Sequence, residues 1–362
     1  MISNSVKPTA HIASVWACRG SPDPSTARRS ADLTLRFKHR VLRFTFYVLR
    51  FTFYVLRFTH HASWYNFSVL TKIRDFLELI KFEHTIFALP FAYVGMFLAA
   101  GGWPTWRQFA WITVAMAAAR TLAMGINRIA DRTLDARNPR TANRPLVTGR
   151  ITLSTAWAGT AVAGLVLGIA AWQLGPLPLL LLPGALLFLV GYAFTKRFTW
   201  LSHFILGFTD GLAPMGAWVA VRGSLFTADD VPAWVLLGVV TLWIGGFDLI
   251  YACQDVEADR AAGLHAIPAQ FGIPVALALS SVCHVGTLML LIALGQTLAL
   301  GWPYWLALAV IAGLLIYEHS LVRPNDLSRV NVAFFNINSY ISVTLFAGVL
   351  GALFLVNGLN GF

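Results

Sequence analysis

Long apolar stretches recur along the chain from residue 83 onward, separated by short polar segments. Each stretch has about 20 residues, the length that an α-helix needs to cross the roughly 30 Å hydrocarbon core of a bilayer. Turn-forming runs such as Gly-Gly-Trp-Pro and Gly-Pro-Leu-Pro lie between consecutive stretches. The pattern predicts an all-α polytopic membrane protein with nine transmembrane helices, at residues 83–101, 106–127, 152–173, 176–195, 201–220, 231–252, 274–295, 300–317 and 335–358.

The composition supports this fold class. Of the 362 residues, 57% are hydrophobic and 12% are charged, whereas about 25% of a soluble domain is charged. A chain this apolar could not cover its surface in water, which excludes a water-soluble enzyme. Cys18, Cys253 and Cys283 show no Cys-x-x-Cys spacing, which excludes a disulfide framework and a cysteine zinc site.

Positive charge is distributed unevenly along the chain. Ten of the 27 Lys and Arg residues precede residue 67, and 14 of the remaining 17 lie on one side of the predicted membrane. Because cytoplasmic loops carry the excess of Lys and Arg, we expect a cytoplasmic N-terminus and, with nine spans, an external C-terminus. The chain is thus predicted to be a multi-pass integral protein of the cell (inner) membrane, embedded in its lipid bilayer. The net charge of +11 gives no argument for a nucleic-acid partner, because it comes mainly from the first 66 residues.

The N-terminal segment differs from the rest of the chain. Residues 41–57 repeat the sequence VLRFTFY, with an Arg in every copy, and the spans between these arginines are too short to cross a bilayer. We therefore expect two domains, a low-complexity extension at 1–68 and a nine-helix transmembrane domain at 69–362. The extension is either an Arg- and Ser-rich targeting peptide or translated upstream repeat DNA with the true start near Val69. The near-identical tandem copies favour the second interpretation.

Two polar stripes lie where the second and sixth predicted helices reach the cytoplasmic face. Asn127, Asp131 and Asp135 are spaced i, i+4, i+8 and share one helical face, with Arg120 two turns deeper. A second stripe, spaced by three, four and four residues, consists of Asp248, Tyr251, Asp255 and Asp259.

The chemistry of these stripes indicates a diphosphate site. Two carboxylate pairs at one membrane face would repel each other unless cations lay between them. Oxygen ligands without His or Cys suit Mg²⁺, which also binds substrate phosphates. Arginines and lysines of the adjoining loops would add positive charge, and the apolar bundle would accommodate a hydrocarbon tail. The competing interpretation, that each stripe is a solvated helix end, explains one such cluster better than two matching ones.

Other ionisable residues carry weaker signals. Asp248 and Arg120 lie inside predicted spans, where a charge is costly and by default indicates function. Asp210 fits a functional role and a merely hydrated one equally well. Structural roles are expected for four histidines that share no ligand spacing, His203, His265, His284 and His319.

At these residues the chain resembles the UbiA family of intramembrane aromatic prenyltransferases. The family signature Asn-Asp-x-x-Asp-x-x-x-Asp corresponds to the stripe from Asn127 to Asp135, with Arg128 in place of the usual acid. A second signature, Tyr-Asp-x-x-Tyr-Ala before Asp-x-x-x-Asp, corresponds to the stripe from Asp248 to Asp259, with Phe247 in place of the first Tyr. The resemblance covers roughly residues 70–360 and also includes Arg140-Thr-Ala-Asn-Arg-Pro-Leu and Tyr192-x-x-x-Lys196-Arg197-x-Thr199.

The resemblance implies a nine-helix bundle that transfers a polyprenyl group from a polyprenyl diphosphate to an aromatic acid, with Mg²⁺ as cofactor. The wording of the motifs is closest to bacterial 4-hydroxybenzoate polyprenyltransferase-like members, which serve quinone biosynthesis. The implied metal-binding and catalytic residues are Asp131, Asp135, Asp255 and Asp259, with Asp248 as a further catalytic residue. The implied substrate-binding residues are Arg120 for the acceptor carboxylate, Asn127, Tyr192 and Tyr251, and Arg137, Arg140, Lys196 and Arg197 for the diphosphate.

Two alternatives stay open at this point. Within the family, the acceptor could be an aromatic acid of the futalosine branch of menaquinone synthesis, haem, chlorophyllide or glycerol phosphate. A transporter or ion pathway would also place carboxylates in the membrane, but it would spread polar residues across the membrane depth. The polar residues here gather at one face, which favours chemistry on an amphiphile.

Overall fold

The computed structural model describes residues 68–356, so the interpretation of the VLRFTFY repeats lies outside the described residues. The described chain is helical, with one isolated bridge between Arg323 and Asp326. Its long helices are α3 (Phe82–Ala100), α4 (Trp106–Ala130), α6 (Leu153–Leu174), α7 (Pro176–Thr195), α8 (Ser202–Arg222), α9 (Val231–Ala252), α12 (Ile273–Thr297), α13 (Trp302–Ser320) and α14 (Asn338–Gly351). Shorter elements are α2 (Ser68–Leu79), α5 (Arg132–Arg137), η1 (Ala228–Asp230), η2 (Cys253–Asp255), α10 (Val256–Ala261), α11 (Ile267–Phe271), η3 (Val332–Ile337) and η4 (Ala352–Val356).

The all-α membrane fold predicted from the apolar stretches is confirmed, because a helix lies at each predicted span. Within residues 68–356, seven helical segments are long and apolar enough to cross a membrane by length and composition. The first and eighth predicted spans are occupied by α3 and α13, which are not among those seven. In α3 the apolar helical part is Ala88–Ala100.

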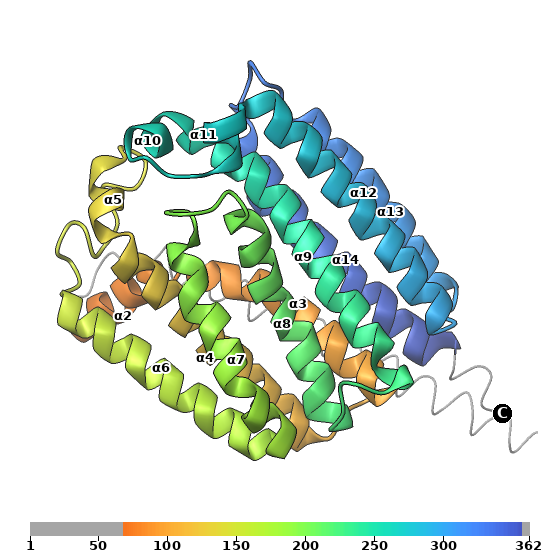
Figure 1. The fold of residues 1–362 in the computed structure, drawn as a ribbon. Coiled ribbons are helices and arrows are strands. Elements are labelled where there is room, and N and C mark those ends of the chain that lie inside the picture. The colour runs from red at the N-terminus through yellow and green to blue at the C-terminus, as the bar shows by residue number, and fades with distance from the viewer. Residues whose placement is uncertain (1–67, 357–362) are drawn as a thin grey trace, which may run out of the picture. The chain divides into compact units, whose positions relative to one another are not determined.

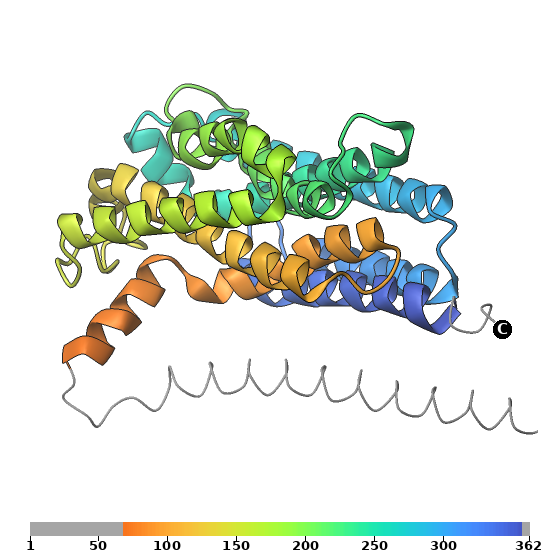
Figure 2. The same ribbon diagram turned by 90° about the horizontal axis from the view of Figure 1, so that it is seen from below.

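Close helix packing holds the bundle together. Helix α8 packs against α3 and α9, α9 packs against α12, and α4 packs against α6. A Cβ atom on Gly95 of α3 would collide with the backbone of Pro214 in α8, and one on Gly207 of α8 would collide with the backbone of Thr241 in α9. Small residues allow this approach in membrane proteins, where helices associate by close packing rather than by escape from water. Helices α6 and α7 lie on one side of the bundle and α12 and α13 on the opposite side (Figures 1 and 2).

The short helices α5, α10 and α11 gather at one end of the bundle, which we call the polar end (Figure 1). Helix α4 stops at Ala130, and Asp131 caps it before α5 begins. Helix α9 likewise passes through the 3₁₀ turn η2 into α10. Both predicted polar stripes therefore continue past the end of a long helix, and each one places its last carboxylate on a short helix at the polar end.

Helix α2 also reaches this end and is tied to the loop before α6. Arg150 binds Asp75 at 2.9 Å and Glu78 at 2.8 Å. The hydrogen bond from Arg150 lowers the pKa of Glu78 below its ordinary value. Figure 2 shows α2 projecting beside the bundle, and the ion pairs of Arg150 connect it to the loop before α6.

Candidate active site

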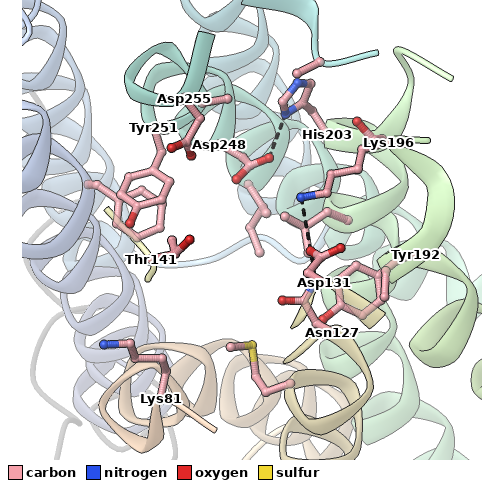
Figure 3. Close-up of a pocket in the computed structure, with 18 of the residues that line it drawn as sticks. Lys81, Asn127, Asp131, Thr141, Tyr192, Lys196, His203, Asp248, Tyr251 and Asp255 are labelled. Carbon is pink, nitrogen blue, oxygen red and sulfur yellow. Dashed lines mark hydrogen bonds and ion pairs between the residues drawn. The ribbon is translucent and has the colours of Figure 1, made fainter. Parts of the chain in front are cut away.

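A cavity of about 520 Å³ lies at the polar end, between the two carboxylate stripes. Figure 3 shows Asn127, Asp131 and Lys196 on one side of this cavity and Tyr251 and Asp255 on the other. The predicted site residues that line it are Arg120, Asn127, Asp131, Asp135, Arg140, Tyr192, Lys196, Asp248, Tyr251, Asp255 and Asp259.

The first side of the cavity is organised around Asp131. Its buried carboxylate accepts from Lys196 Nζ at 3.1 Å and from Arg197 Nη2 at 2.9 Å, both at the end of α7. Asn127 Nδ2 lies 3.4 Å from the same carboxylate. Arg197 also donates to two backbone carbonyls, so it fixes the end of α7 against α4 while Lys196 remains at the cavity wall.

Asp135 and Arg128 complete this side. Arg144 Nη1 binds the buried carboxylate of Asp135 at 2.6 Å. Arg128 turns toward α2, where its Nε donates to the Leu79 carbonyl at 3.3 Å, and its Nη1 lies 3.4 Å from Asn127 Oδ1. The Arg that replaces the family's usual acid thus holds the neighbouring Asn in place.

The second side is organised around Asp255. Arg140 binds its carboxylate through Nε and Nη2, and Asn138 Nδ2 donates to it at 2.8 Å. Arg140 Nη1 also donates to the Tyr251 hydroxyl at 2.7 Å. Burial lowers the pKa of the Arg140 guanidinium, but the hydrogen bond to Asp255 and the electrostatic attraction of Tyr251, Asp255 and Asp135 together raise the pKa above its usual value. Arg140 is therefore a permanent positive charge at the cavity. Asp259 also lines the cavity and takes part in no ion pair among the described residues.

Asp248 lies between the two sides and pairs with His203 of α8. His203 Nδ1 is 2.7 Å from Asp248, and His203 Nε2 accepts from the backbone N–H of Ile267 at 3.3 Å. Because Nε2 accepts, Nδ1 carries the proton that it donates to Asp248. The ring therefore links the cavity to α11.

Arg120 pairs with Asp210 at the deep end of the cavity. The nitrogen–oxygen distance is 3.1 Å, and the buried Nε of Arg120 has no hydrogen-bond partner among the described residues. Asp248 does not share this pair, because it binds His203 instead. Both members of the pair also line a second, largely apolar cavity of about 320 Å³ among α4, α6, α7 and α8.

A row of aromatic rings forms one wall of the main cavity. Trp243 of α9 lies edge-on to Phe247, with 5.0 Å between ring centroids, and Phe247 lies edge-on to Phe334 of η3 at 5.2 Å. Phe334 stacks on Tyr251 at 4.1 Å. The Phe that replaces the family's usual Tyr at position 247 thus joins an apolar wall.

Most of the predicted site residues line the main cavity, and two of them do not. Arg137 is exposed on α5 and does not line the cavity, and Arg197 reaches Asp131 without lining it. Their expected contacts with substrate stay predictions. Several further residues line the cavity but were not predicted as site residues. They are Arg144, which belongs to the matched Arg-Thr-Ala-Asn-Arg-Pro-Leu motif, and Lys81, Asn138, Trp243, Phe334, Asn338 and His203, the last of which was expected to be structural.

The donor set fits Mg²⁺ that arrives with a phosphate ligand. No three His, Cys, Asp or Glu side chains among the described residues are arranged to hold a metal by themselves. However, Mg²⁺ commonly binds through one or two carboxylates, with waters and substrate phosphates completing its coordination. Asp131 and Asp135 on one side, and Asp255 and Asp259 on the other, could each supply such a pair.

Comparison with known proteins identifies the class. The model of the UbiA prenyltransferase family matches residues 88–340, and the chain belongs to this family. The chain is 33% identical over 291 residues to a 4-hydroxybenzoate octaprenyltransferase from Cupriavidus necator, covering 77% of this chain and 97% of that protein. It is 31% identical over 280 residues to a protein of the same name from Paraburkholderia phytofirmans, covering 76% and 94%.

Solved structures share the fold. A UbiA homolog from Aeropyrum pernix K1, in its apo form, has a TM-score of 0.67 and 34% identity, covering 76% of this chain and 98% of that one. A UbiA homolog from Archaeoglobus fulgidus bound to DMAPP and Mg²⁺ has a TM-score of 0.54 and 19% identity, covering 75% and 99%. The chain is therefore a prenyltransferase with the helical fold of this family.

Proposed function

We propose that this prenyltransferase transfers a polyprenyl group from a polyprenyl diphosphate to an aromatic acid, with 4-hydroxybenzoate as the acceptor, at the cytoplasmic face of the membrane. The observation that carries the proposal is the pair of carboxylate clusters that line one cavity, each accompanied by a basic residue. Figure 3 shows one carboxylate of each cluster, Asp131 and Asp255, on opposite sides of this cavity. The names of the relatives support the acceptor.

The two sides of the cavity would bind the diphosphate between them. When bound, Mg²⁺ would neutralise the charge that develops on the departing diphosphate. Lys196 and Arg140 already lie at the cavity, each in an ion pair with a carboxylate. When a diphosphate and its metal arrive, the carboxylates can bind the metal and these cations can turn to phosphate oxygens. Their charge is then placed where it develops in the transition state, which is the most effective position for electrostatic catalysis.

Arg120 is the candidate for binding the acceptor carboxylate. Its Nη1 donates to Asp210, whereas its buried Nε has no hydrogen-bond partner within residues 68–356. An unsatisfied buried donor costs about 1–3 kcal/mol, so a ligand oxygen that accepts from it would be favoured. Asn127 lies two helical turns above Arg120 on α4 and would contact the acceptor ring nearer the diphosphate.

The reaction then follows from these positions. The allylic C–O bond of the donor breaks, and its electron pair leaves with the diphosphate. A ring carbon ortho to the acceptor's phenol oxygen forms the new C–C bond, and loss of the proton on that carbon restores aromaticity. The aromatic wall that contains Trp243, Phe247 and Phe334 would exclude water, which would otherwise capture the allylic cation.

The test is prenyl transfer by purified protein in liposomes that contain a polyprenyl diphosphate and Mg²⁺. Parallel reactions contain 4-hydroxybenzoate, a different aromatic acid or a glycerol phosphate lipid. Product from 4-hydroxybenzoate alone is expected. Product from another acceptor alone would contradict the acceptor assignment, and no transfer to any acceptor would contradict the reaction.

Arg120→Gln/Asp210→Asn tests acceptor binding without leaving one buried charge unpaired. We expect the KM for 4-hydroxybenzoate to rise by about 10- to 100-fold, since hydrogen bonds to charged groups contribute about 1.5–3 kcal/mol. The KM for the donor should change little. Arg222→Gln is the matched control, because Arg222 pairs with exposed Asp229 between α8 and α9.

A further inference from the structure

A buried polar pair adjoins the aromatic wall and has no role in the proposed reaction; its Asn338 lines the cavity, whereas its Glu318 does not. Glu318 of α13 is 0% exposed and Asn338 of α14 is 4% exposed. Asn338 Nδ2 donates to Glu318 Oε1 at 3.1 Å. A buried carboxyl group is costly unless it is well satisfied. Glu318 Oε2 has no hydrogen-bond partner among the described residues and lies 3.8 Å from Nδ1 of the buried His284. So costly a group at this place needs an explanation beyond packing.

Asn338 connects this pair to the π-helical turn η3. Its Nδ2 lies 3.2 Å from the Ala333 carbonyl and 3.0 Å from the Phe334 carbonyl. A π-helical turn is wider than an α-helical turn and occurs frequently at functional sites. The Asn338 side chain binds carbonyls of this turn, and Glu318 holds the amide in the orientation that allows it to do so.

The η3 turn places Phe334 against the side of the cavity that is organised around Asp255. Phe334 stacks on Tyr251, with 4.1 Å between ring centroids and 30° between ring planes. Tyr251 accepts from Arg140 at 2.7 Å, and Arg140 binds Asp255. Contacts thus run without a break from the buried pair to a carboxylate of the proposed diphosphate site.

We infer that Glu318 and Asn338 are positioning residues for the donor diphosphate. They fix the η3 turn so that Phe334 holds the Tyr251 ring, and this ring sets the direction of the Arg140 guanidinium toward Asp255. The inference rests on the proposed function, because it assigns Arg140 and Asp255 to diphosphate binding. It predicts that loss of the pair weakens donor binding and leaves acceptor binding at Arg120 unchanged.

The test compares Asn338→Leu, Glu318→Leu and Glu318→Gln with the wild type. Asn338→Leu removes the donated hydrogen bonds at similar volume, and Glu318→Gln keeps an oxygen that accepts from Asn338. We expect Asn338→Leu and Glu318→Leu each to raise the KM for the donor by about tenfold, because small misplacements of a positioning group are costly in catalysis. Glu318→Gln should stay near the wild type. The double Leu variant should be no worse than either single variant, since residues that act as one unit are not additive.

The matched control is Asn336→Leu, which changes an exposed residue of the same turn and should leave the donor KM unchanged. A second measurement, Mg²⁺-dependent binding of geranyl diphosphate at equilibrium, should show the same order of variants. An active wild type whose donor KM and geranyl diphosphate affinity are unaffected by Asn338→Leu would overturn the inference alone. Equal losses in donor KM, acceptor KM and kcat would also overturn it, as would an equal effect of Asn336→Leu. A wild type that neither transfers prenyl groups nor binds geranyl diphosphate would overturn the proposed function and this inference together.

Discussion

Asp210 offers a sharp test of how charge is held within the bundle. Its carboxylate accepts from Arg120 Nη1 at 3.1 and 3.3 Å, and the two side chains are only 19% and 14% exposed. Asp210→Asn keeps the shape of the side chain and one oxygen that can accept, but it removes the negative charge. Arg120 is then left as a mostly buried cation without a counter-charge.

The magnitude follows from this geometry. Two charges about 4 Å apart attract by about 4 kcal/mol at an effective dielectric constant of about 20. Removing one partner of a fully buried pair costs about 3–5 kcal/mol, and this pair keeps some solvent exposure and an amide oxygen. We therefore expect a loss of about 2–3 kcal/mol, or a fall in Tm of at least about 4 °C at about 2–4 °C per kcal/mol.

The assay is thermal unfolding of purified protein in a mild detergent. Asp229→Asn is the matched control, because Asp229 binds Arg222 at 3.3 Å but is 80% exposed, and exposed pairs contribute about 0–1 kcal/mol. The control should lower Tm by about 0–4 °C, which is less than the fall expected for Asp210→Asn. Equal Tm values for the two variants would refute the claim that the Arg120–Asp210 pair is a buried structural charge pair.

Further predictions concern the donor side and the loop contacts. Lys196→Met should raise the KM for the prenyl donor by about tenfold, because one charge-assisted contact contributes about 1.5–3 kcal/mol. Asp131 keeps its pair with Arg197, so Tm should change little. An unchanged KM for the prenyl donor would contradict this role of Lys196. Since Arg150 lowers the pKa of Glu78 below 4.5 in the folded protein, their contact stabilises the fold above that pH and is lost as the pH falls. Glu78→Gln should therefore lower Tm at neutral pH, and the Tm of this variant should fall less than that of the wild type as the pH is lowered. Parallel profiles of Tm against pH for variant and wild type would contradict this role of the Arg150–Glu78 contact.

The fold was predictable because apolar length alone specifies membrane helices. The breaks at the polar end were not predictable from spacing. The period that links Asp131 to Asp135 continues across the junction of α4 and α5, so a helical pattern could not show that the long helix had ended. The same holds for Asp255, which lies in the 3₁₀ turn after α9.

The partners of the site residues depend on tertiary contacts, which sequence spacing does not reveal. His203 is 45 residues from Asp248, and no ligand-like spacing marked it. Asp210 became the partner of Arg120 because α8 faces α4 at that depth. Asn338 carried no sequence signal, since its contact with Glu318 depends on the packing of α13 against α14. Arg144 could have been found, because it stands in the motif that was already matched to the family.

The most direct test of the central claim is calorimetric binding of geranyl diphosphate with and without Mg²⁺. The carboxylates of the described cavity do not form a metal site by themselves, so we expect metal and diphosphate to bind together and neither to bind tightly alone. Asp131→Asn/Asp255→Asn should abolish this joint binding, while Asp229→Asn should retain it. Tight Mg²⁺-independent binding of the diphosphate, or joint binding that survives in the double variant, would contradict a shared metal–diphosphate site between these carboxylates.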